Sequence, residues 1–205
     1  MGFVSILSQK SDKIVIFPRN KPFGTLFVID KSEYNYLKER RITMNFNNFT
    51  IKAQEAVQEA VNLTQAHNGQ VIEPIHLLQA VMKVGENVTK FIFQKLGVNG
   101  QQIVNVVARQ IESLPKVSGG NPYLSRESND VLQKAVQYSK EMGDEFVSIE
   151  PIMLALLVVK STASSILKDA GVSEKELREA INELRKGERV TSQSSEDTYQ
   201  SLEKY

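Results

Sequence analysis

The sequence predicts an all-α fold of eight helices, arranged as two four-helix repeats about a pseudo-twofold axis. The first observation is a duplicated stretch: IEPIHLLQA begins at Ile72, and IEPIMLALL begins 77 residues later, at Ile149. The second is a helical apolar face that recurs with a spacing of 75 residues. Each copy is too short to bury a core alone, so two copies packed face to face are expected to share one.

Residues 1–43 do not resemble the repeats. Two β-rich runs, at 13–17 and 25–29, are separated by prolines and a glycine, which favours a loose hairpin. This segment carries eight Lys and Arg against four Asp and Glu, whereas the rest of the chain carries 17 against 20. We interpret Met44 as the natural start of the protein and 1–43 as upstream sequence read in frame. An authentic β-hairpin extension is the alternative.

Each repeat opens with a helix whose small and apolar residues recur at i, i+3, i+4, i+7 and i+8. Thr50 is the predicted N-cap of the first helix, and Ser125 is that of its counterpart, because a hydroxyl can accept a hydrogen bond from an unpaired first-turn N–H. The face consists of Ala53, Ala56, Val57, Ala60, Val61 and Thr64 in the first repeat, and of Ser128, Val131, Leu132, Ala135, Val136 and Ser139 in the second.

The second helix of each repeat is expected to start at its Glu-Pro pair. Proline has the φ angle of a first helical turn, and the glutamate adds a negative charge at the positive end of the helix dipole. The third helices are expected at 88–96 and 164–170, each followed by a glycine, and Asn99 and Ser173 are predicted to cap the fourth. The domain then spans 44–187, with repeats at about 49–114 and 124–187, and 188–205 is expected to hold a flexible linker, at 191–197, and the start of a further amphipathic element, at 199–205.

Composition excludes several classes of function. The chain has no cysteine, so disulfides, thiolate metal sites and cysteine nucleophiles are absent. The predicted domain is mildly acidic rather than basic, which argues against nucleic acid as a partner. Its apolar runs are far shorter than the ~20 residues needed to span a bilayer, so a membrane is not expected either.

The motifs of common enzymes are also missing. The sequence contains no G-x-x-x-x-G-K-[ST] phosphate loop, no G-x-S-x-G and no H-E-x-x-H. Its two histidines, His67 and His76, have no recognised metal-ligand spacing, and His76 is expected to be a packing residue. A small hydrolase that uses Asp144 and Glu150 is the enzymatic hypothesis, and it would need two carboxylates with well separated pKa values. We predict no catalytic residue, metal or cofactor in this chain.

Several stretches, in the expected order, resemble the Clp N-terminal repeat domain, and most closely that of the ClpB family of protein-disaggregating AAA+ chaperones. They are FTIKAQEA from Phe49, IEPIHLL from Ile72, GDEFVSIE from Gly143 and ILKDAG from Ile166. The tail, 182–188 and 194–205, resembles the ClpB linker and the start of its first ATPase module. The resemblance covers 44–205 and leaves out 1–43.

The resemblance implies a client-recognition domain that binds exposed apolar segments of unfolded or aggregated protein. In the full-length parent, hexameric ATPase rings that bind ATP and Mg would thread the client, in cooperation with an Hsp70-type chaperone system in the cytoplasm. Those ATPase modules would follow residue 205, so this chain is expected to be monomeric and to lack ATPase activity. The alternative is the related Clp domain that docks an adaptor for a protease-associated unfoldase.

The family's client-contact positions fall on Thr50, Asp144 and Glu150. Each has an ordinary structural role too, as an N-cap, a turn residue and a helix-start charge respectively. Unlike many relatives, this chain has a proline, Pro151, directly after that glutamate, which leaves the shape of the groove edge open. An apolar groove beside these residues would bind clients through burial of apolar surface, at about 25 cal/mol per Å². Its candidate lining, which could equally be core, is Leu132, Val147 and Ile152.

Overall fold

The structure, a computed structural model, describes residues 13–16, 27–30, 46–117 and 121–195. The chain divides into two compact units, Met1–Asn45 and Phe46–Tyr205. In the first unit, β1 (Lys13–Ile16) pairs antiparallel with β2 (Phe27–Asp30), the hairpin expected from the two β-rich runs. The interpretation of Met44 as the natural start stays a prediction.

The second unit is all-α and confirms the predicted fold class. Its described residues contain a short 3-10 helix, η1 (Phe46–Asn48), and eight α-helices in two sets of four. The first set is α2 (Ile51–Ala66), α3 (Pro74–Val84), α4 (Glu86–Lys95) and α5 (Gly100–Glu112). The second set is α6 (Arg126–Glu141), α7 (Ile149–Val158), α8 (Thr162–Asp169) and α9 (Glu174–Arg185).

The predicted caps start the helices as expected. Four side chains accept a hydrogen bond from the backbone N–H three residues later: Thr50 from Ala53 (3.1 Å), Asn99 from Gln102 (3.1 Å), Ser125 from Ser128 (3.0 Å) and Ser173 from Glu176 (3.3 Å). The glycines after α4 and α8 have φ of 66° and 91°, which favours a residue without a Cβ. Local chemistry therefore sets most helix boundaries.

The two repeats are joined by a symmetric exchange of backbone pairs. β3 (Val71–Ile72) runs parallel to β4 (Tyr123–Leu124), and an isolated bridge pairs Phe49 with Val147. Adding 75 to residues 49 and 72 gives 124 and 147, so the two connections are equivalent under exchange of the repeats. The N-cap residues follow the same rule: Thr50 N–H donates to Val147 O at 2.9 Å, and Ser125 N–H donates to Ile72 O at 3.1 Å. The pseudo-twofold axis predicted from sequence is therefore present in the backbone.

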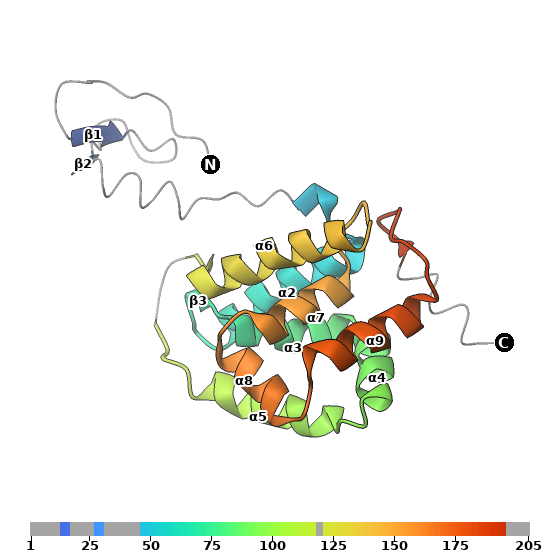
Figure 1. Cartoon of the computed structure of the whole chain (residues 1–205). Coiled ribbons are helices and arrows are strands. Elements are labelled where there is room, and N and C mark those ends of the chain that lie inside the picture. Colours follow the sequence, from blue (N-terminus) through green and yellow to red (C-terminus); the bar gives the residue numbers. More distant parts are fainter. Residues whose placement is uncertain (1–12, 17–26, 31–45, 118–120, 196–205) are drawn as a thin grey trace. The chain divides into compact units, whose positions relative to one another are not determined.

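The second helices of the two repeats form the centre of the core. Figure 1 shows α3 and α7 in the middle of the domain, with α2 and α6 above them and α5 and α8 below in that view. Contacts cross between the repeats in pairs, α4 against α9 and α5 against α8. Nine residues of α7, Ile149–Leu157, are buried, and eight of them are at most 1% exposed. This burial explains why α7, apart from Glu150, is apolar on every side.

No single helix among the described residues is long and apolar enough to cross a membrane. Only α7 and α8 taken together have the required length and composition, and they are bent by 92° relative to each other.

The Glu-Pro pairs do not occupy equivalent positions in the two repeats, contrary to the sequence expectation. Glu73 is the N-cap of α3, and Pro74 is its first residue. In the second repeat Ser148 is the N-cap, so Glu150 is already the second residue of α7. The backbone pairs relate the repeats by 75 residues at this point, which places Glu150 where the first repeat has Ile75. A carboxylate therefore occupies a core position.

The folded domain extends beyond residue 187, where the predicted domain ends. Val190 is 0% exposed, and its carbonyl accepts a hydrogen bond from Glu145 N–H at 2.9 Å. The carbonyl of Gln193 accepts one from Ile51 N–H at 2.9 Å. We call residues 188–193 the exit segment. The assignment of 188–205 to a linker stays a prediction; in this structure one buried aliphatic side chain and backbone hydrogen bonds hold residues 188–193, and 196–205 lies outside the described residues.

Candidate functional site

A buried arginine connects the two carboxylates that sequence analysis singled out. Arg185, at the end of α9, donates from Nε to Glu150 Oε1 at 2.9 Å and from a terminal nitrogen to Asp144 Oδ2 at 2.7 Å. Its other terminal nitrogen donates to Ser148 Oγ at 2.9 Å. The side chain of Arg185 is 5% exposed, and those of Asp144 and Glu150 are 0% exposed. We call these four residues the Arg185 cluster.

The electrostatics of the cluster keep the guanidinium charged. Burial alone would lower the pKa of Arg185, but the charges of Glu150 and Asp144, with their hydrogen bonds, outweigh it and raise that pKa above its ordinary value. Glu150 Oε2 is buried without a hydrogen-bond partner among the described residues. Asp144 uses its second oxygen outside the cluster, where Oδ1 accepts from Val190 N–H at 3.0 Å. The exit segment is thus hydrogen-bonded to the cluster.

The first repeat shows what this cluster replaces. The buried face of α5 includes Ile103, Val107 and Ile111, and 74 residues on, the buried face of α9 includes Leu177, Ile181 and Arg185. Arg185 thus takes the place of Ile111, as Glu150 takes that of Ile75. Sequence reasoning missed Arg185, although a charged residue at the next position of an apolar stripe was a usable signal.

The six predicted client-contact residues all have buried side chains. Asp144 and Glu150 meet through Arg185, and Thr50 meets Val147 through the backbone bond between the repeats. Exposure is 0% for Thr50, Leu132 and Glu150, 2% for Val147 and 1% for Ile152. In this conformation none of them offers a side chain to a partner. Client contact by these residues stays a prediction, and it requires movement at the edge where they lie.

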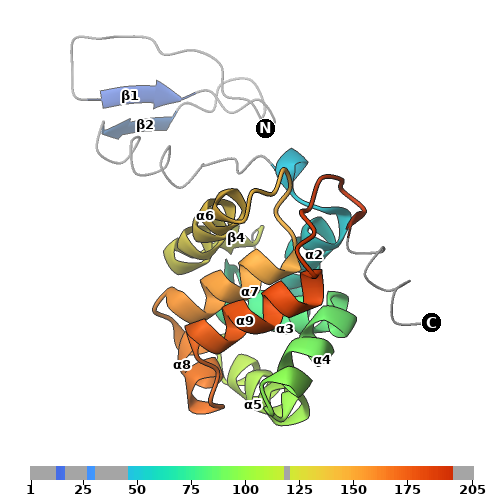
Figure 2. The ribbon, with the colours of Figure 1, turned by 45° about the vertical axis from the view of Figure 1, so that its right-hand side comes forward.

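That edge is covered by the exit segment. Residues 144–147 lie beside η1 and the start of α2, and residues 188–193 hydrogen-bond to both. Figure 2 shows the red chain after α9 turning back toward the blue-green start of α2. Sequence reasoning missed this contact as well. Its one signal was Val190, an isolated aliphatic residue in a polar stretch.

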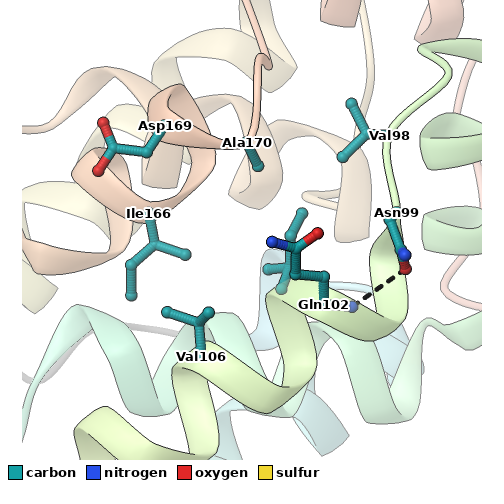
Figure 3. A pocket seen from close by; sticks show the side chains of 8 residues that line it. Val98, Asn99, Gln102, Val106, Ile166, Asp169 and Ala170 are labelled. Atoms are coloured by element: carbon teal, nitrogen blue, oxygen red, sulfur yellow. Dashed lines mark hydrogen bonds between the residues drawn. The ribbon is translucent and has the colours of Figure 1, made fainter.

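A separate cavity of about 390 Å³ lies between the repeats, where α5 meets α8. Ile166 and Val106 face each other across it, and Asn99 bonds to the backbone of Gln102 at its rim (Figure 3). Val106 is 37% exposed. None of the predicted client-contact residues lines this cavity, and sequence reasoning did not identify it. Its lining is mixed, with Asn99, Gln102 and Asp169 beside apolar side chains.

The described residues contain no arrangement typical of an active site. No three His, Cys, Asp or Glu side chains among them lie close enough to hold a metal ion. Asp144 and Glu150 are both hydrogen-bonded to Arg185 and closed to solvent, so neither can reach a substrate in this conformation. The arrangement therefore does not support the hydrolase hypothesis.

Comparison with known proteins identifies the domain. The family model for the Clp repeat (R) N-terminal domain matches residues 48–168. The chain belongs to this family. The Clp N-domain is not a catalytic domain.

The chain is 80% identical over 162 residues to the chaperone protein ClpB of Bacteroides thetaiotaomicron and 56% identical over 162 residues to that of Porphyromonas gingivalis. These matches cover 79% of this chain and 19% of each relative, so the chain spans about a fifth of their length.

Solved structures show the same fold. The Hsp104 N-terminal domain from Candida albicans matches with a TM-score of 0.66 and 22% identity, over 73% of this chain and 99% of that one. A complex of the ClpV N-domain with a VipB peptide matches with a TM-score of 0.55 and 17% identity, over 67% of this chain and 86% of that one. At such identities the likeness concerns the fold of the Clp N-domain alone.

Proposed function

We propose that this Clp N-domain is the client-recognition domain of an ATP-dependent disaggregase of the ClpB type. It binds exposed apolar segments of unfolded or aggregated polypeptides. The observation that carries the proposal is the 80% identity to ClpB over 162 residues. The ClpV N-domain complex supports it, because a domain of the same fold takes a peptide there.

The adaptor-docking alternative has weaker support. The N-terminal domain of ClpD from Arabidopsis thaliana, a caseinolytic protease associated chaperone, is 22% identical to this chain. The identity to ClpB is far higher, so the disaggregase is the better-supported parent.

The full-length parent supplies the rest of the activity. We infer that ATP and Mg are bound by ATPase modules outside this chain, that the parent is a cytoplasmic hexamer, and that it works with an Hsp70-type chaperone system. This chain alone acts as a monomer. Its contribution is reversible contact with the client, and a surface that serves many clients binds each of them weakly.

The proposal is tested by measuring the affinity of the 205-residue chain for fluorescently labelled α-lactalbumin in two forms. Reduced and carboxymethylated, this protein is permanently unfolded and exposes apolar segments; in its native form it does not. We expect saturable binding of the unfolded form and none of the native form in fluorescence anisotropy. Equal binding of both forms, or binding of neither, contradicts the proposed function.

A further inference from the structure

The exit segment fills a surface site in a way that resembles a bound peptide. We propose that the edge formed by residues 144–146 and Ile51 is a binding site for a polypeptide segment with one aliphatic side chain, and that the exit segment occupies this site in cis. The inference rests on the proposed function, because it names where a client binds and what regulates access.

Val190 makes every contact expected of an anchor residue. Its N–H donates to Asp144 Oδ1 at 3.0 Å, and its carbonyl accepts from the N–H groups of Glu145 and Phe146 at 2.9 and 3.4 Å. Val190 is 0% exposed, so its side chain is buried. Both backbone groups are therefore paired and the aliphatic group is buried. No other residue of the exit segment is buried in this way.

A second anchor follows three residues later and is polar. The carbonyl of Gln193 accepts from Ile51 N–H at 2.9 Å, and its side-chain Nε2 donates to Asn47 O at 2.9 Å. Between the anchors, Thr191 and Ser192 are exposed. The site therefore recognises mainly the backbone and one aliphatic group. Backbone pairing of this kind tolerates many sequences, as a receptor for diverse clients requires.

Release of the exit segment leaves three backbone N–H groups and one carboxylate oxygen without their hydrogen-bond partners. Ile51 N–H belongs to the first turn of α2, where a helix cannot satisfy its own donors. Glu145 and Phe146 also lose their acceptor, and Asp144 Oδ1 loses its donor. Once the edge is open, either water or the backbone of a client can pair with these groups. A client segment that follows the path of the exit segment, with a bend after its aliphatic residue, would replace these hydrogen bonds, so client and exit segment compete for the same site.

The Arg185 cluster positions the acceptor of this site. Arg185 holds Asp144 Oδ2 at 2.7 Å, while Oδ1 of the same carboxylate receives the N–H of Val190. Arg185 does not contact the exit segment through this interaction, so it is a positioning residue. The buried ion pair of the second repeat thereby has a role that the isoleucines of the first repeat could not perform.

A reversible cross-link provides the sharpest test. The substitutions Ile51→Cys and Gln193→Cys place the only two cysteines of the chain on residues whose backbones are hydrogen-bonded, and titration of free thiols shows whether the disulfide has formed. Oxidation locks the exit segment in its site. We expect the oxidised chain to bind unfolded α-lactalbumin about tenfold more weakly or worse, since apparent affinity scales with the fraction of open sites. Dithiothreitol should restore binding, and each single-cysteine variant should be unaffected by the same treatment.

A substitution that releases the exit segment should have the opposite effect on client binding. Val190→Asp puts a carboxylate beside Asp144 and should release the exit segment, which raises tryptic cleavage after Arg189 and tightens client binding. Val117→Asp is the matched control, because Val117 is 48% exposed. If the locked, parent and Val190→Asp chains bind the unfolded protein equally, the inference is wrong and the proposed function stands. If none of the three binds it, both are wrong.

Discussion

Glu150 and Arg185 form a buried ion pair where the first repeat holds Ile75 and Ile111. The carboxylate and guanidinium are joined at 2.9 Å, and their side chains are 0% and 5% exposed. A buried pair of this kind is not required for stability, because hydrophobic residues of similar volume often serve as well or better. The pair differs from the isoleucines of the first repeat in what it holds, namely Asp144 and, through Asp144, the exit segment.

Removing one partner of the pair should be costly. We expect Arg185→Ile to lower the free energy of unfolding by about 3–5 kcal/mol, because it leaves two buried carboxylates without their cation. Urea unfolding followed by circular dichroism measures this cost. The double variant Glu150→Ile with Arg185→Ile recreates the apolar pair of the first repeat, and it should recover part of the loss. A double variant less stable than Arg185→Ile alone would contradict the equivalence of the two positions.

The fold was predictable because its signals are local. Thr50, Ser125, Asn99 and Ser173 lie next to the helices they cap, and the apolar periodicity of each helix is contained within it. The offset of the second Glu-Pro pair was not predictable from its own residues. It depends on Val147 pairing with Phe49, a contact between residues far apart in sequence.

The candidate site was predictable only in part, for the same reason. Asp144 and Glu150 were singled out as two carboxylates of one turn, but their common partner, Arg185, lies 41 and 35 positions further along the chain. Val190 was placed outside the predicted domain because its neighbours are polar. One buried aliphatic side chain with paired backbone groups was sufficient to anchor the segment, and composition averaged over the segment conceals that.

The repeats approach each other closely at Gly85, between α3 and α4. A Cβ at this position would lie 2.8 Å from Ile149 Cγ2 and 2.9 Å from Val81 O. We therefore expect Gly85→Ala to destabilise the domain by about 1–3 kcal/mol through overpacking. Combining it with Ile149→Ala should cost less than the sum of the two single changes, since one side of the clash is removed. Additive costs in urea unfolding would show that these residues do not interact.

His76 should make the stability of the domain depend on pH. Its Nδ1 accepts a hydrogen bond from Glu73 N–H at 3.0 Å, which requires the neutral ring at that atom. Burial, with the nearby charge of His67, lowers the pKa of His76 from 6.5 to about 4. The pKa of His76 is lower in the folded than in the unfolded state. The neutral ring therefore makes its full contribution to the free energy of unfolding above pH 6.5, and this contribution is lost as the pH falls toward 4. The loss is at most about 3 kcal/mol.

A glutamine at this position provides the control for the pH effect. His76→Gln keeps an acceptor at the third helical position, as in a capping box, but cannot titrate. We expect its melting temperature to fall less than that of the parent between pH 7 and pH 4.5. The same fall in both proteins would assign the pH dependence to other groups.

Thr50 and Ser125 allow the cap role to be separated from client contact. Both hydroxyls cap the first helix of a repeat, and both residues donate their backbone N–H to the other repeat. Thr50→Ala and Ser125→Ala should each cost about 1 kcal/mol of stability. Only Thr50 precedes Ile51, whose N–H holds the exit segment. We therefore expect only Thr50→Ala to change the affinity for unfolded α-lactalbumin, measured by anisotropy at a temperature where both variants are folded. Equal changes in affinity would reduce Thr50 to a helix cap and move the client site away from this edge.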